Sequence, residues 1–157
     1  DSMATLKAFS TTTISLFKTQ YDIERLLAKH GIAASRWTHY SETPQEPGLV
    51  RFEFEWRRNE EGPAIGFRIQ ISYKYEKGPR GGNSGTSREQ AGRALFWHVK
   101  NLFDAVAYGI VEMEEAFLPY LLTAGGRTAY EELAPRIERL TEEDLPPLLT
   151  EGRGAGR

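Results

Sequence analysis

Two segments in the middle of the chain alternate between apolar and polar residues with a period of two. They span residues 49–57 and 64–75. Successive side chains of a strand point to opposite faces of a sheet, so this alternation predicts two strands that each bury one face. Residues 59–63 predict the hairpin turn between them, and residues 36–41 predict a shorter strand before them. The apolar positions are Val50, Phe52, Phe54 and Trp56 in the first segment and Ile65, Phe67, Ile69, Ile71, Tyr73 and Tyr75 in the second.

Apolar residues on either side of these strands recur every three or four positions, which is typical of helices with one buried face. Thr19 and Asp22 have the spacing of a capping box and Gly31 is a suitable stop, so a helix is expected over residues 20–30. Near the other end of the chain, Thr128 and Glu131 have the same capping spacing and predict a short helix, which Pro135 limits or bends.

The longest helical pattern begins at Ser87, where Gln90 follows at the capping-box spacing. Pro119 is expected to end or kink this helix because proline lacks the backbone donor. One face of the helix is apolar and should lie across the apolar face of the sheet. That face holds Ala91, Leu95, Val99, Leu102, Val106, Ile110, Met113 and Phe117.

Together these elements predict a single α+β domain over residues 3–140. It consists of an N-terminal helix, a three-stranded antiparallel sheet, a long C-terminal helix packed on the sheet and a further short helix. Residues 3–15 are rich in Ser and Thr and suit an extended arm or an edge strand. Residues 78–87 hold four glycines and predict a flexible loop. Residues 141–157 are expected to form a flexible tail.

Composition narrows the class of protein. Hydrophobic residues make up 39% of the 157 residues and charged residues 27%, which is typical of a globular domain. The lack of cysteine excludes disulfides, thiolate nucleophiles and sulfur metal sites, and it favours a reducing compartment, so a cytoplasmic location without membrane association is expected. The three histidines, His30, His39 and His98, fit no metal motif, so neither a metal nor a cofactor is predicted.

Charge is unevenly distributed along the chain. Residues 68–100 hold seven basic and two acidic groups, whereas residues 101–157 hold five basic and eleven acidic groups. Basic side chains on the predicted hairpin and around the following loop favour binding of nucleic acid through its phosphates, and Trp56, Tyr73 and Tyr75 are candidates for stacking. The alternative is that these aromatics are core and the arginines pair with nearby glutamates. The predicted contact residues are Arg51, Arg57, Arg68, Lys74, Lys77, Arg80, Arg88 and Arg93.

A second hypothesis comes from the aromatic residues of the long helix. The aromatic surface of Trp97, Phe103 and Tyr108 is larger than one small sheet can cover. Exposed aromatic side chains are frequent at protein interfaces. This predicts either a homodimer or binding to a host or phage protein. Catalysis is the third hypothesis. Carboxylates such as Glu53 and Glu55 could support an activity, but the sequence shows no combination of nucleophile, base and oxyanion site.

Two resemblances add to these expectations. Residues 21–27 with Gly31, residues 114–122, the triplet Gly126-Arg127-Thr128 and residues 134–137 resemble a family of small proteins encoded by phages, prophages and other mobile elements. The resemblance spans about residues 10–140, implies an accessory role in that genomic setting and carries over no catalytic residues.

The order of helix, three strands and helix is also similar to that of a double-stranded-RNA-binding domain. That resemblance implies phosphate contacts at the start of the long helix, where Arg88 and Arg93 stand in place of a lysine cluster. The type of nucleic acid stays open.

Overall fold

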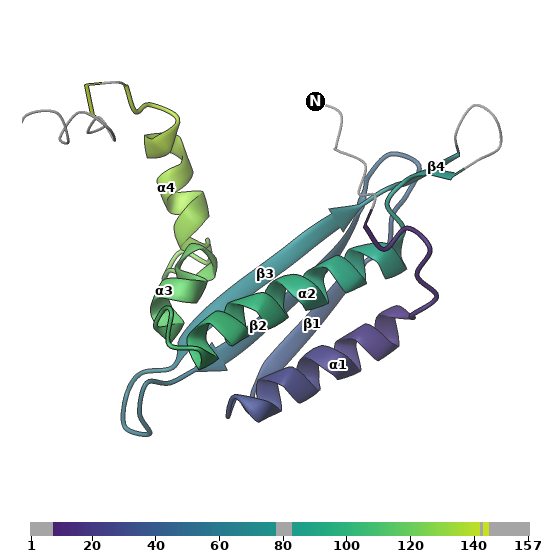
Figure 1. The fold of residues 1–157 in the computed structure, drawn as a ribbon. Coiled ribbons are helices and arrows are strands. Elements are labelled where there is room, and N and C mark those ends of the chain that lie inside the picture. Colours follow the sequence, from purple (N-terminus) through teal and green to yellow (C-terminus); the bar gives the residue numbers. More distant parts are fainter. Residues whose placement is uncertain (1–7, 78–82, 142, 145–157) are drawn as a thin grey trace, which may run out of the picture.

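The computed structural model describes residues 8–77, 83–141 and 143–144. Their order confirms the predicted α+β class: an N-terminal helix, a three-stranded antiparallel sheet and further helices (Figure 1). The elements are α1 (Leu16–Lys29), β1 (Ser35–Tyr40), β2 (Gly48–Trp56), β3 (Ile65–Tyr73), β4 (Tyr75–Lys77), β5 (Asn83–Gly85), α2 (Arg88–Ala107), α3 (Met113–Phe117), the 3-10 helix η1 (Leu118–Tyr120) and α4 (Ala129–Ile137).

The sheet is an antiparallel meander in the order β1-β2-β3. Its register places Phe52 of β2 beside Trp37 of β1 and Ile69 of β3, so the alternating apolar residues of all three strands share one face. Helices α1 and α2 both lie along that face (Figure 1). The predicted packing of the long helix on the sheet is therefore confirmed, and the opposite face carries the polar residues of the strands.

The core lies between the sheet and the two helices. Phenylalanine rings from four elements meet there: Phe54 of β2, Phe67 of β3, Phe103 of α2 and Phe117 of α3, with centroid separations from 4.9 to 6.0 Å. Gly92 brings α2 close to α1, because a Cβ at this position would meet a methyl carbon of Leu16 at 3.1 Å. The two helices consequently pack against each other as well as against the sheet.

Helix α1 begins at Leu16, four residues before the predicted start at residue 20. Ser15 is the N-cap and its hydroxyl accepts from the backbone N–H of Lys18 at 3.2 Å, which leaves Thr19 fully buried inside the helix. The predicted cap at Thr19 is wrong because Leu16 belongs to the core and extends the helix backwards. Residues 8–15 form turns and irregular backbone, so of the two alternatives for residues 3–15, an extended arm or an edge strand, the edge strand is not found over this part.

Helices α2 and α4 begin at the predicted caps, but α2 ends earlier than predicted. Ser87 caps α2 by accepting from the N–H of Gln90 at 3.1 Å, and Thr128 caps α4 by accepting from that of Glu131 at 3.2 Å, as predicted. Helix α2 nevertheless ends at Ala107, well before Pro119. Gly109 has a φ of 72°, and the N–H of Ile110 donates to the carbonyl of Ala105 at 3.0 Å, which closes the helix.

The segment predicted as one flexible loop over residues 78–87 is partly ordered. Residues 83–85 form β5, which pairs with β4, and Ser87 caps α2. Tyr75 belongs to β4 and not to β3, which ends at Tyr73. Residues 78–82 and 145–157 lie outside the described residues.

Within the part of the chain that the structure describes, no helix is both long enough and apolar enough to cross a bilayer.

Candidate nucleic-acid interface

The polar face of the sheet brings together arginines from all three strands. Arg36 of β1 and Arg68 of β3 flank Glu53 of β2 in one row, and Arg51 lies in the next row between Thr38 and Gln70. We call this surface, formed by Arg36, Thr38, Arg51, Glu53, Arg68 and Gln70, the sheet face.

Glu53 holds two of these arginines. Its Oε1 accepts from Nε and Nη2 of Arg36 at 3.0 and 2.8 Å, and its Oε2 accepts from Nε and Nη2 of Arg68 at 3.1 and 3.0 Å. Arg68 also donates to the carbonyl of Gly126 at 2.9 Å. The side chain of Arg36 is 72% exposed, whereas that of Arg68 is 18% exposed. Arg68 therefore has a structural role.

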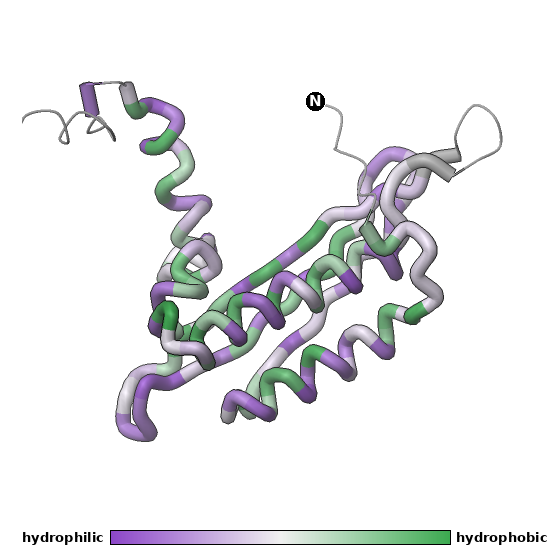
Figure 2. Tube along the Cα trace, viewed as in Figure 1, coloured by the Kyte–Doolittle hydropathy of each residue, from purple (hydrophilic) through white to green (hydrophobic). Residues whose placement is uncertain are grey.

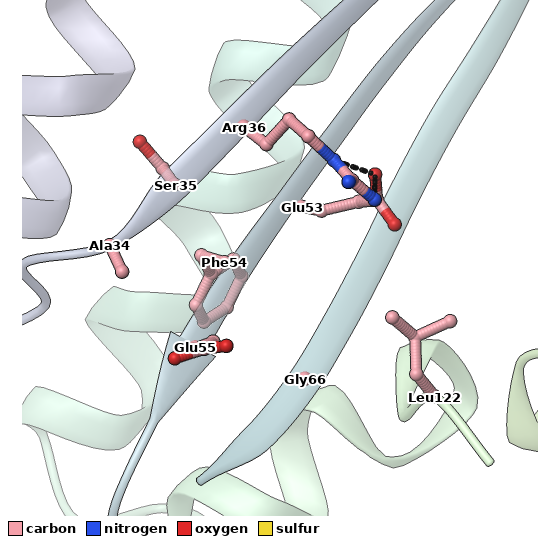
Figure 3. Close-up of a pocket in the computed structure, with 8 residues that line it drawn as sticks. All are labelled: Ala34, Ser35, Arg36, Glu53, Phe54, Glu55, Gly66 and Leu122. Atoms are coloured by element: carbon pink, nitrogen blue, oxygen red, sulfur yellow. Dashed lines mark hydrogen bonds and ion pairs between the residues drawn. The ribbon is translucent and has the colours of Figure 1, made fainter. Parts of the chain in front are cut away.

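A hollow of about 300 Å³ adjoins this ion-pair cluster (Figure 3). Glu53 and Arg36 lie along it, and Glu55 adds a second carboxylate. Gly66 and Leu122 form part of the rim. Because both carboxylates face the same hollow, it offers a mixed environment that does not favour a phosphate.

The geometry makes the stability of the fold sensitive to acid. Burial by itself raises the pKa of Glu53, but the hydrogen bonds and charges of Arg36 and Arg68 outweigh it and hold this pKa below its usual value. A carboxyl whose pKa is lowered by folding stabilises the fold at pH values above its unfolded pKa of about 4.3, and this contribution is lost as pH falls through the folded pKa.

We therefore expect Glu53→Gln to reduce the free energy of unfolding by about 1–3 kcal/mol at neutral pH. The difference from the parent protein should shrink as pH falls below about 4, the usual range of a glutamate pKa. Urea denaturation at a series of pH values measures both effects. Glu60→Gln, at an exposed position in the β2–β3 turn, is the control and should follow the parent curve. A constant difference between Glu53→Gln and the parent at all pH values would contradict the assignment.

The other predicted contact residues do not form one surface with the sheet face. Arg57 lies at the β2–β3 turn and donates to the carbonyl of Gly62 at 2.7 Å, whereas Arg88 lies at the start of α2 and pairs with Glu89 at 2.9 Å. These two arginines are at opposite ends of the sheet (Figure 1). Lys74 is half-buried, and the side chain of Lys77 and all of Arg80 lie outside the described residues.

Arg93 is buried, so its predicted role as a phosphate contact is wrong. Its Nη1 donates to Oδ2 of Asp22 at 3.0 Å and to Oγ1 of Thr19 at 3.3 Å. Its guanidinium also stacks over the ring of Phe96 at 4.5 Å. The residue therefore joins α2 to α1, and the likeness to a double-stranded-RNA-binding domain does not extend to a phosphate-binding cluster at the start of α2.

Some of the candidate aromatic residues are buried and others are exposed. Phe103 is fully buried in the core, so its assignment to an interface is wrong, while Trp97 and Tyr108 are exposed on α2. Tyr73 is buried as well, and its hydroxyl lies 2.5 Å from Nε2 of His39. Among the three aromatics considered for stacking, Tyr75 is the exposed one.

A second basic surface lies on the other side of the molecule, between the two helices. Lys18, Arg25 and Lys29 project from one side of α1, because their spacing of seven and four residues follows the helical repeat. Arg25 and Lys29 face Lys100 of α2 across a hollow of about 410 Å³. We call this surface the helix groove. It comprises the residues that line the hollow, Asp22, Arg25, Leu26, Lys29, Phe96 and Lys100, together with Lys18, Tyr21 and Trp97, which contact each other or the lining residues through cation–π pairs.

Acidic residues in and beside the helix groove are already paired. The pKa of Asp22 is lowered mainly by a hydrogen bond from Lys18, with Arg93 adding to the effect against an opposing contribution from burial. Asp104 pairs with Lys100 at 2.5 Å. Among the described residues, Arg25 and Lys29 have no ion-pair partner. The groove therefore presents an excess of positive charge.

Exposed aromatic rings alternate with these cations. The charged groups of Lys18 and Arg25 lie 5.6 and 5.8 Å from the ring centre of Tyr21, and that of Lys100 lies 5.9 Å from the ring centre of Trp97. Rings held beside basic groups offer stacking surfaces for bases next to contacts for phosphates. This surface was not predicted from the sequence, although the spacing of Lys18, Arg25 and Lys29 along one helix was the signal for it.

The histidines have structural partners. His30 stacks on Phe103 with the ring centres 4.5 Å apart, and Nε2 of His98 lies 2.6 Å from the hydroxyl of Tyr120. Within residues 8–77, 83–141 and 143–144, no group of three or more His, Asp or Glu side chains is placed to hold a metal ion. No protein-family model, curated protein or solved structure matches the chain.

Proposed function

We propose that this domain binds single-stranded nucleic acid, mainly through phosphate contacts in the helix groove. The observation that carries the proposal is the position of Arg25 and Lys29, two basic side chains without an ion-pair partner among the described residues, in one hollow with Lys100. Exposed rings adjoin the hollow, with Tyr21 beside Arg25 and Trp97 beside Lys100. An accessory role in a phage or mobile element, as the family resemblance implies, is part of the same proposal.

The helix groove is a better candidate than the sheet face that the sequence suggested. On the sheet face, Arg68 is held by Glu53 and Gly126, and Arg51 donates to Gln70 at 3.1 Å. Glu55, which lines the same hollow, would also repel a phosphate there. In the groove, by contrast, the acidic side chains are neutralised by neighbours and free cations remain.

A single strand fits the groove better than a duplex. Tyr21 and Trp97 can stack only on bases that are not already stacked in a duplex. The side chains that would contact a duplex at the start of α2 are also unsuited, because Arg88 pairs with Glu89 and Arg93 is buried.

The test is binding of labelled single-stranded and double-stranded DNA and RNA by fluorescence anisotropy across a salt series. The triple variant Arg25→Ala, Lys29→Ala, Lys100→Ala removes three basic groups and should reduce the slope of log K against log salt by about 2, at roughly 0.7 per phosphate contact on a single strand. Trp97→Ala should weaken binding by about 1–3 kcal/mol with little change of slope.

The matched control is Arg51→Ala, Arg57→Ala, Arg88→Ala, which makes the same change in net charge at three of the originally predicted positions. It should retain most of the affinity and most of the slope. If the control loses binding and the groove variant does not, the interface is on the hairpin. If the parent protein binds none of the four probes at low salt, the proposed function is wrong.

A protein-binding role is the alternative, and one observation favours it. Tyr108 at the end of α2 is 82% exposed, and the neighbouring Ile110 is also exposed. Exposed apolar groups of this kind are frequent at protein interfaces. Under this alternative, Tyr108→Ala would abolish recovery of a host or phage partner, and the groove variant would leave it unchanged.

A further inference from the structure

Helix α4 has an apolar face that none of the described residues covers. Tyr130, Leu133, Ile137 and Leu140 are each between 46 and 60% exposed, and no residue of α4 is buried apart from its N-cap Thr128. Their spacing of three, four and three residues places them on one side of the helix and of the turn that follows it. Figure 2 shows hydrophobic positions recurring along this helix.

The position of α4 explains why its apolar face is uncovered. The N–H of Ala129 donates to the carbonyl of Leu121 at 2.7 Å, and the N–H of Thr123 donates to that of Arg127 at 2.8 Å. These bonds fix the start of the helix beside η1. From there α4 extends away from the sheet and from α1 and α2 (Figure 1).

The spacing of the four apolar residues is the same in both directions. Read forwards or backwards, the intervals are three, four and three residues, so the pattern is symmetric about position 135. When two copies of such a helix lie antiparallel, Tyr130 of each faces Leu140 of the other, and Leu133 of each faces Ile137 of the other. A two-fold interface requires this reciprocity, in which residue i contacts j and j contacts i.

Charge favours the same orientation. Glu131 and Glu132 lie in the first turn of α4, whereas Arg136 is in its last turn and Arg139 follows shortly after, so that the C-terminal end keeps a net positive charge although Glu138 lies between the two arginines. Antiparallel pairing places the acidic start of each helix next to the basic end of the other. Parallel pairing would place like charges together. The dipoles of the two helices also oppose each other in the antiparallel arrangement.

We propose that the apolar face of α4 docks on α4 of a second copy of this chain, antiparallel and around a two-fold axis near position 135. The α4 helix is nine residues and about 13 Å long, so the pair buries less than a standard interface of about 1,600 Å². The dimer therefore dissociates at low concentration. It leaves the helix groove of each copy accessible, because α4 extends away from α1 and α2 (Figure 1).

Sedimentation velocity of the full chain, over a concentration series from about 1 to about 300 µM, a range suited to an interface smaller than standard, tests association. The parent protein should shift from monomer to dimer, and Leu133→Glu, Ile137→Glu should stay monomeric throughout. Phe17→Glu is the control, because Phe17 is an apolar residue on α1 that is even more exposed than Leu133 and Ile137, and it should dimerise like the parent. A parent protein that is monomeric at every concentration would overturn the proposal and leave the face for a different partner.

Orientation is tested by disulfide trapping, for which the chain is suited because it has no cysteine. Tyr130→Cys and Leu140→Cys should cross-link efficiently when mixed and poorly when each is oxidised alone, since like positions lie about 15 Å apart along the axis of an antiparallel pair. Labelling with a maleimide checks that both thiols are equally reactive. Efficient cross-linking of Tyr130→Cys to itself would show a parallel arrangement and overturn the proposal.

Discussion

Replacing Phe103 by alanine is expected to lower the free energy of unfolding by about 3–5 kcal/mol, the usual cost of removing a phenylalanine from a core. Phe103 has no exposed surface. Its ring lies 4.5 Å from that of His30, 4.9 Å from that of Phe117 and 6.0 Å from that of Phe54. The ring thus connects the end of α1, helix α3 and strand β2, and its removal leaves a cavity that these elements cannot fill without moving.

Urea denaturation of Phe103→Ala measures this cost directly. Tyr108→Ala is the matched control because it removes an aromatic ring from the exposed C-cap of the same helix. Surface substitutions usually change stability by less than about 0.5 kcal/mol. Equal stability of the two variants would show that Phe103 is not part of the core. Its original assignment to a protein interface would then stand.

Arg93→Ala should also destabilise the fold strongly, by about 2–4 kcal/mol. The guanidinium donates to Asp22 and Thr19 of α1, and it stacks on Phe96. Removing it leaves a partly buried carboxylate with Lys18 as its remaining charged partner. This loss is larger than that of a surface ion pair, which contributes at most about 1 kcal/mol.

A double-mutant cycle separates the ion pair from the lost packing. Asp22→Ala should make the further change Arg93→Ala less costly, with a coupling energy of about 1–3 kcal/mol, as is usual for residues in one network. The pair of Lys100 and Asp104, which is more exposed, provides the comparison and should couple by less than about 1 kcal/mol. A coupling of Arg93 and Asp22 no larger than that of the exposed pair would mean that the guanidinium contributes through packing alone.

The sheet was predictable because apolar and polar residues that alternate with a period of two over nine residues indicate a strand and not a helix. The N-caps at Ser87 and Thr128 were predictable because each stands next to a single helical pattern. At the N-terminus, however, Ser15 and Thr19 are both suitable caps within a stretch rich in Ser and Thr. The choice between them depends on whether Leu16 reaches the core, which is a tertiary contact.

The end of α2 was hidden for a related reason. Met113 and Phe117 continue the apolar repeat of α2 past Gly109, because α3 packs on the same core from a separate helix. Periodicity reports which residues are buried together and not whether the backbone between them is continuous. Gly109 was the local signal for a break, and it was outweighed by the regular pattern around it.

The site residues were less predictable than the fold. Helix α2 faces both the sheet and α1, so it buries a wider arc than one apolar stripe, and this arc includes Phe103 and Arg93. Whether an arginine lies in that arc depends on the partner that α1 offers, here Asp22. The basic surface of the helix groove likewise arises only when two helices that are far apart in the sequence lie side by side.

The pairing of α1 with α2 also affects how the chain is made. The ribosome releases α1 before the sheet and α2, but Ile23 and Leu27 bury their side chains against elements that follow later, and α2 begins nearly sixty residues after α1 ends. At roughly 5–20 residues per second, the apolar side of α1 is uncovered for several seconds during synthesis. The strands between them can pair as soon as each hairpin has emerged. Helix α1 is therefore the segment for which a chaperone would have the longest opportunity to bind the nascent chain.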